Sequence, residues 1–204
     1  MARHGQTVWN VEGRWQGSRD IPLDGEGLAQ AERLAEKLLM YSARNKIEAA
    51  YTSPLARAAA TADACAAKLG LRARRHDGLV EMRLGAWEGL SFPEIAARYP
   101  EEFSRFNADP RAAVGMGVES HGELQERATG AFWEICGAEK RDTLIVTHGG
   151  WLGALLRELL GVPFGRRHGF AIGNVGLSIV ECDFSGERSA KVATLNDCSH
   201  LGGL

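Results

Sequence analysis

The segment Thr143-Leu144-Ile145-Val146-Thr147-His148-Gly149-Gly150 joins the most apolar strand pattern of the chain to the start of a helix pattern. Residues 143–147 are apolar on both faces, which is typical of a central strand in a parallel sheet. Open α/β sheets bind ligands at the carboxyl ends of such strands, where His148 lies, and the two glycines let the backbone approach a ligand closely. The helix predicted over 150–160 directs its first N–H groups to the same point, where anions bind readily.

Helix and strand patterns alternate along the rest of the chain, which predicts an α/β fold with a largely parallel sheet. Capping signals mark where several helices begin. The predicted elements are, in chain order, a helix over 28–39, a strand at 47–52, a helix capped by Ser53 that runs to residue 69, a strand at 71–76, helices opened by Ser91 and Ser120, and an antiparallel edge pair of strands at 177–183 and 191–195.

Length and composition indicate one globular domain over residues 1–204, with a small helical cap around 90–120. The net charge of −2 gives no electrostatic reason to expect a nucleic acid or a membrane surface as partner. The apolar stretch 151–160 contains Arg157 and Glu158 and is too short to span a bilayer, and we find no secretory signal pattern.

The chain has four cysteines, which form no C-x-x-C pair and show no metal-ligand spacing. We therefore expect reduced thiols in a cytoplasmic protein and no metal held by cysteine. The four are Cys65, Cys136, Cys182 and Cys198.

A second histidine-glycine pair occurs in Arg3-His4-Gly5-Gln6-Thr7-Val8-Trp9-Asn10. If this segment also leaves the end of a strand, His4 and His148 converge on one site. A neutral imidazole can attack phosphorus while an arginine and oriented N–H groups hold the phosphoryl oxygens. The two pairs together favour phosphoryl transfer, although a single histidine is more often structural.

Two further residues are candidates for this site. Arg57 lies one turn into the helix that follows Ser53, so its guanidinium can bind phosphate oxygens, although an arginine at such a position is, taken alone, more often a solvated residue on the helix surface. Glu81 lies between apolar residues and can serve as the proton donor to a leaving oxygen. The alternative interpretation of Glu81 is a carboxylate without a catalytic role that forms an ion pair with Arg83. His121, in the capping box at Ser120, is expected at the surface.

These residues belong to a longer set of motifs that resembles the histidine phosphatase superfamily, also called phosphoglycerate-mutase-like. The resemblance covers nearly the whole chain in the right order. The matching motifs are Arg3-His4-Gly5-Gln6-Thr7 with Trp9-Asn10, Gly13-Arg14-Trp15-Gln16-Gly17, Pro22-Leu23, Gly27 with Gln30-Ala31, Ser53-Pro54-Leu55 with Arg57-Ala58 and Thr61-Ala62, Glu81, Gly85 with Trp87-Glu88-Gly89, Thr147-His148-Gly149-Gly150, Gly173-Asn174, and 195–201.

The resemblance implies a three-layer α/β/α sandwich with a mostly parallel central sheet. It also implies a reaction through a phosphohistidine on His4 that needs no metal and no cofactor. Glu81 protonates the leaving alcohol and then helps to activate water, while a protonated His148 steadies the transferring group. The implied phosphate-binding residues are Arg3, Asn10, Arg57 and Gly149, and Gln16 is the implied substrate contact.

The family places an apolar strand of about five residues before its first motif, whereas Met1 and Ala2 alone precede Arg3 here, so we expect a truncated first strand.

The short segment between Gly89 and Ser120 favours a phosphatase over a cofactor-dependent phosphoglycerate mutase, which carries longer insertions there. The small bacterial branch includes alpha-ribazole, phosphoserine and broad-specificity phosphatases. A small phosphorylated metabolite is therefore the expected substrate. A mutase, a non-catalytic phosphoester-binding protein and a homodimer stay open as alternatives.

Overall fold

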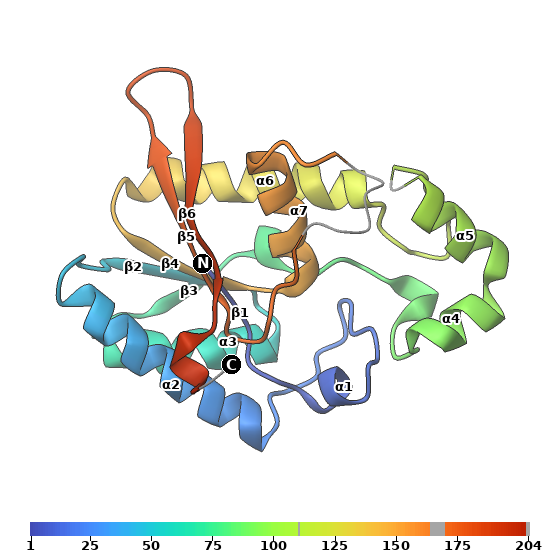
Figure 1. Cartoon of the computed structure of the whole chain (residues 1–204), viewed down its shortest axis with the longest axis horizontal. Coiled ribbons are helices and arrows are strands. Elements are labelled where there is room, and N and C mark those ends of the chain that lie inside the picture. The colour runs from blue at the N-terminus through green and yellow to red at the C-terminus, as the bar shows by residue number, and fades with distance from the viewer. Residues whose placement is uncertain (110, 164–169, 203–204) are drawn as a thin grey trace.

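The central sheet has the strand order β3-β2-β4-β1-β5-β6 in the computed structural model, which describes residues 1–109, 111–163 and 170–202 (Figure 1). The pairings β1–β4, β2–β4 and β2–β3 are parallel, whereas β1–β5 and β5–β6 are antiparallel. The strands are β1 (Ala2–Arg3), β2 (Ala49–Thr52), β3 (Ala73–Arg75), β4 (Thr143–Thr147), β5 (Leu177–Asp183) and β6 (Ser189–Asp197).

Helices cover both faces of this sheet, which gives the three layers that the motifs predicted (Figure 1). On one face Leu144 and Val146 of β4 pack with α2 (Gly25–Ser42) and α3 (Ala56–Lys68). On the other face Ile145 packs with α6 (His121–Glu139) and α7 (Gly149–Leu159). Alternate residues of β4 thus enter two different cores, which explains why this strand is apolar on both faces.

The strand β1 lies between β4 and β5 and consists of two residues, Ala2 and Arg3. Ala2 pairs with Val146 on one side and with Leu177 on the other, and it is fully buried. A cavity of about 670 Å³ lies beside this strand and is lined by Met1 and by residues of β4 and β5, among others.

The predicted start of α3 is wrong, because the helix begins at Ala56 and its N-cap is Leu55 instead of Ser53. The Ser53 hydroxyl accepts from the Leu55 amide, so it shapes the turn before the helix. The Ala56 amide donates to Asp20 Oδ1 at 2.6 Å, so a side chain from a distant loop satisfies this helix end.

Between Gly89 and Ser120 the chain forms α4 (Phe92–Arg98) and α5 (Pro100–Ala108), which extend to one side of the sheet (Figure 1). The predicted capping boxes at Ser91 and Ser120 are both present. The remaining helical segments are α1 (Val8–Val11) and the single turns Asp77–Leu79, Gly85–Trp87 and Ser199–Leu201.

Candidate active site

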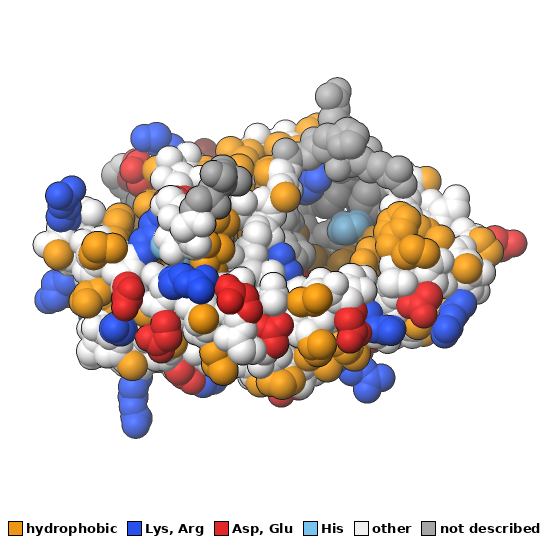
Figure 2. Space-filling view, turned by 60° about the horizontal axis from the view of Figure 1, so that its bottom comes forward, with side chains coloured by type: hydrophobic (Ala, Val, Ile, Leu, Met, Phe, Trp, Pro, Cys, Tyr) orange, Lys and Arg blue, Asp and Glu red, His pale blue; other side chains and the backbone are white. Residues whose placement is uncertain are grey.

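A cavity of about 450 Å³ opens at the carboxyl ends of β1 and β4, between the sheet and the α4–α5 region (Figure 2). It contains all but one of the site residues that the sequence predicted. The lining includes Arg3, His4, Asn10, Gln16, Arg57, Glu81 and Gly149. The exception, His148, is fully buried directly beside His4, with 5.2 Å between the two ring centroids.

The His4 ring is held in one orientation and one tautomer. Its Nδ1 atom is 2.7 Å from the carbonyl oxygen of Gly5, and because a carbonyl can only accept, Nδ1 carries the proton and Nε2 keeps its lone pair. Burial lowers the pKa of His4 well below its usual value, and Arg3 and Arg57 lower it further. The imidazole is therefore neutral at physiological pH, as a nucleophile must be.

His148 begins α7 as its N-cap, and both of its ring nitrogens lack a hydrogen-bond partner among the described residues. Burial lowers its pKa well below the usual value, with further contributions from Arg57, His4 and Arg3. The ring is thus neutral when no anion is present. A phosphate dianion beside it would favour the protonated form, because an opposite charge at short range raises the pKa of a histidine.

Two arginines approach the same end of the cavity from different elements. Arg3 Nη1 donates to the Ile172 carbonyl at 2.7 Å, and Arg57 donates to the carbonyls of Arg19 and Gly17. The Nε atom of each arginine is buried and has no partner among the described residues. Arg57 is 0% exposed, so the alternative of a solvated surface arginine is wrong. Buried guanidinium groups with spare donors form a site for an anion.

Asn10 is oriented by a residue for which the sequence analysis assigned no role. Its Oδ1 accepts from the amide and hydroxyl of Thr7 and from Asn174 Nδ2 at 3.2 Å. Asn174 Nδ2 also donates to the His4 carbonyl at 3.0 Å. Because Oδ1 is occupied three times, the Asn10 amino group is the end that faces the cavity. Asn174 belongs to the Gly173-Asn174 motif of the family resemblance, and this motif was the signal from which a role for Asn174 could have been predicted.

The carboxyl group of Glu81 lies at the N-terminus of α7, although Glu81 itself belongs to a preceding loop. The alternative of an ion pair with Arg83 is wrong, because Arg83 pairs with Glu119. Glu81 Oε1 accepts from the Met82 and Trp151 amides and Glu81 Oε2 from the Gly150 amide, all at 2.9–3.0 Å. Among the described residues Oε2 has one donor, which leaves a lone pair for a proton. The helix start therefore holds the carboxyl group in a fixed place beside the cavity.

The loop that carries Glu81 is held from behind by a buried ion pair. The Glu119 side chain is 1% exposed, and its oxygens accept hydrogen bonds from Arg127 Nε at 3.0 Å and from Arg127 Nη2 at 2.9 Å. Arg127 Nη1 also donates to the carbonyls of Gly78 and Val80. No sequence pattern singles out Arg127, because an arginine within a helix pattern is usually solvated.

His121 was expected at the surface, and this expectation is wrong. It lines the cavity and lies against Phe106, with 4.5 Å between the ring centroids. Burial lowers its pKa to about 4, so the ring is neutral at physiological pH. A capping box predicts where a helix begins and says nothing about what packs against its first turn.

Within residues 1–109, 111–163 and 170–202, no three side chains of His, Cys, Asp or Glu lie close enough together to hold a metal ion. Nor does any helix there combine the length and apolar character that crossing a bilayer demands.

Comparison with known proteins gives one consistent family. A family model described as histidine phosphatase superfamily (branch 1) matches residues 1–196. Phosphoserine phosphatase 1 of Hydrogenobacter thermophilus is 30% identical over 99% of this chain and 93% of that protein. Phosphoglycerate mutase-like protein 4 of Arabidopsis thaliana is 38% identical over 76% of this chain and 67% of that protein.

Solved structures match over nearly the whole chain. Bacillus stearothermophilus YhfR superposes with a TM-score of 0.87 at 31% identity and covers 98% of this chain and 96% of its own. A mycobacterial glucosyl-3-phosphoglycerate phosphatase, described in complex with VO3, superposes with a TM-score of 0.83 at 29% identity and covers 96% of this chain and 97% of its own.

Proposed function

Since the chain belongs to the histidine phosphatase superfamily, we propose that it hydrolyses a small phosphate monoester through a phosphohistidine on His4. The observation that carries the proposal is the neutral His4 ring, with Nδ1 bound to Gly5 and Nε2 unprotonated, in a cavity that also contains Arg3 and Arg57.

In the first step the His4 Nε2 lone pair forms a bond to phosphorus while the bond from phosphorus to the alcohol oxygen breaks. Arg3, Arg57 and Asn10 donate to the phosphoryl oxygens, and these fixed donors stabilise the charge of the transition state. His148 takes up a proton as the dianion binds and adds a further positive charge. Glu81 gives its proton to the leaving alcohol.

In the second step a water molecule replaces the alcohol. Glu81, now ionised, accepts a proton from the water as its oxygen bonds to phosphorus, and the bond between phosphorus and Nε2 breaks. Inorganic phosphate leaves, and both His4 and Glu81 return to their starting protonation states. The cations that the reaction requires are supplied by arginine and histidine side chains in this scheme.

Replacement of His4 tests the proposal. The wild-type protein should hydrolyse p-nitrophenyl phosphate in buffer with EDTA, and rapid quenching with ³²P-labelled substrate should trap an acid-labile, alkali-stable label. His4→Ala should lose both the activity and the label. The matched control is His76→Ala, because His76 lies outside the cavity and faces Glu134. Substantial turnover by His4→Ala would refute the mechanism.

A phosphoglycerate mutase is the second candidate, favoured by the similarity to the Arabidopsis mutase-like protein. Against it stands the short segment between Gly89 and Ser120, which contains the two helices α4 and α5. Interconversion of 2- and 3-phosphoglycerate that is stimulated by the bisphosphate would select the mutase. Tight phosphate binding without hydrolysis of any ester would select a non-catalytic binding protein.

A further inference from the structure

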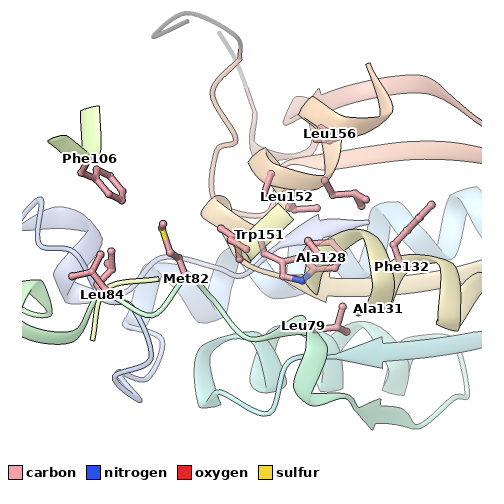
Figure 3. Packing of buried hydrophobic residues seen from close by; sticks show 14 of the residues in the cluster. Leu79, Met82, Leu84, Phe106, Ala128, Ala131, Phe132, Trp151, Leu152 and Leu156 are labelled. Atoms are coloured by element: carbon pink, nitrogen blue, oxygen red, sulfur yellow. The ribbon is translucent and has the colours of Figure 1, made fainter. Parts of the chain in front are cut away.

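The cavity has a second half beyond the phosphate donors, and its wall is apolar and aromatic. Met82 and Leu84 are each 6% exposed and Phe106 is 4% exposed. These three side chains lie at the cavity end of the large hydrophobic cluster, away from Phe132 and Leu156 (Figure 3). The side chains that form this wall are Trp9, Trp15, Met82, Leu84, Phe106 and His121.

The aromatic part of the wall is held rigidly by ring contacts. Phe106 meets Trp87 edge to face at 5.1 Å, and Trp15 meets Trp87 at 6.2 Å. His121 covers Phe106 with 35° between the ring planes. A ligand group that binds here therefore meets preformed flat surfaces, so that few side chains must be ordered on binding.

The charges around the wall do not suit a zwitterionic leaving group. Glu81 is the one acidic residue among the described lining residues, and its oxygens already accept three backbone N–H groups. Among the described lining residues an ammonium group would find only the lone pair of Glu81 Oε2 that these N–H groups leave open. Arg14 Nε donates to Glu12 Oε2 at 2.7 Å, and Arg14 Nη1 donates to the Gly89 carbonyl. His121 carries no charge at physiological pH because its pKa is lowered to about 4.

Beside this wall, the lining residue Gln16 has a polar atom without a hydrogen-bond partner among the described residues. Gln16 is 8% exposed, and its Oε1 is buried without a hydrogen bond to any described residue. A buried oxygen of this kind is costly unless a ligand or water donates to it. The cavity thus presents one acceptor beside its aromatic surfaces.

We propose that the substrate is a phosphate monoester whose alcohol carries a flat apolar ring, with an N–H or O–H group placed to donate to Gln16 Oε1. The proposal rests on the phosphatase function proposed above and adds the class of leaving group. It sets such esters apart from phosphorylated amino acids, because their ammonium group would meet a Glu81 that already accepts three N–H groups and their carboxylate would compete with Glu12 for Arg14.

The experiment compares esters whose leaving alcohols have similar basicity, so that binding and not intrinsic reactivity decides the outcome. The three substrates are 2-phenylethyl phosphate, propyl phosphate and phosphoserine. We expect kcat/KM for the phenylethyl ester to exceed that for each of the other two by about tenfold or more, as an apolar pocket can achieve.

Variants of the wall locate the preference. His121→Ala should reduce the ratio of phenylethyl to propyl kcat/KM by about two- to tenfold, the worth of one ring contact. His121→Phe should retain the ratio because it keeps a flat ring over Phe106. The control is Phe184→Ala, which removes a partly exposed aromatic side chain far from the wall and should leave the ratio unchanged.

The outcomes separate this inference from the function on which it rests. Failure to hydrolyse any of these esters or p-nitrophenyl phosphate would overturn the phosphatase function itself. His4-dependent hydrolysis with equal kcat/KM for phenylethyl and propyl phosphate, or with a preference for phosphoserine, would overturn the leaving-group proposal alone. So would a ratio that His121→Ala leaves unchanged in a protein with a normal melting temperature.

Discussion

Replacing Arg127 by methionine should destabilise the protein and at the same time displace Glu81, the proposed proton donor. The change leaves the Glu119 carboxylate, 1% exposed, without its bidentate partner. Removing one member of a buried ion pair costs about 3–5 kcal/mol. The Arg83 amide and guanidinium remain at 3.0 Å and 3.5 Å from Glu119, which places the expected loss near the lower end, about 3 kcal/mol.

Thermal unfolding followed by circular dichroism measures this loss. For a domain of this size about 1 kcal/mol corresponds to a shift of about 2–4 °C, so the melting temperature should fall by about 6–12 °C. The double variant Glu119→Gln with Arg127→Met removes the stranded charge and should recover part of the loss, with a coupling of about 1–3 kcal/mol.

The activity of the variant should also fall, because Arg127 donates to the carbonyls of Gly78 and Val80 in the loop that carries Glu81. We expect kcat for p-nitrophenyl phosphate to decrease more than KM changes, since the phosphate donors lie on other elements. The matched control is Arg141→Met, which breaks an ion pair with 42% of the arginine side chain exposed and should cost about 1 kcal/mol or less. A fall in melting temperature of about 2 °C or less for Arg127→Met would refute the reasoning.

Three further predictions concern the site and the sheet. Gly150→Ala should fold normally yet lose kcat, because the new Cβ would lie 2.5 Å from Glu81 Oε1, whereas Gly149→Ala meets Arg3 at 3.4 Å and should lose much less. Stability should fall as the pH drops below 6.5, by up to about 1.4 kcal/mol per pH unit for each of His4 and His148, because both take up protons near pH 6.5 in the unfolded chain and far lower in the folded one. A short apolar strand joined ahead of β1 should fill the cavity of about 670 Å³ beside β4 and β5 and raise the melting temperature.

Each of these has a contrary result. Equal kcat values for the two glycine variants would show that the Glu81 carboxylate has room to adjust. A urea unfolding free energy that stays constant between pH 6.5 and about pH 5 would contradict the lowered histidine pKa values. An added strand that leaves the melting temperature unchanged would show that the cavity costs the sheet nothing.

The order of layers and the gathering of the candidate site residues around one cavity could be predicted because each has a local signal. The apolar pattern of β4 and the His-Gly-Gly that follows it place a strand end, a ligand and a helix start within a few residues. The start of α3 could not be predicted in this way, because the Ala56 amide is satisfied by Asp20, which lies far away in sequence.

The errors at His121 and the omission of Arg127 have the same origin. Both are polar residues on α6, where the sequence pattern favours a solvated face. Phe106 covers His121, and Glu119 takes up Arg127, through contacts between elements that no local pattern records. Burial of a polar side chain is decided by such tertiary partners, and a single sequence does not display them.

The position of β1 between β4 and β5 has a consequence for how the protein is made. His4, the proposed nucleophile, lies far ahead in the sequence of Val146 and Leu177, which pair with its strand, and of Asn174, which binds its carbonyl oxygen. A ribosome-bound chain that has emerged only as far as α6 therefore contains His4 without the neighbours that fix it. Since contacts distant in sequence form late and slow folding, reactivity towards phosphate esters should arise only after Leu177 has emerged from the ribosome.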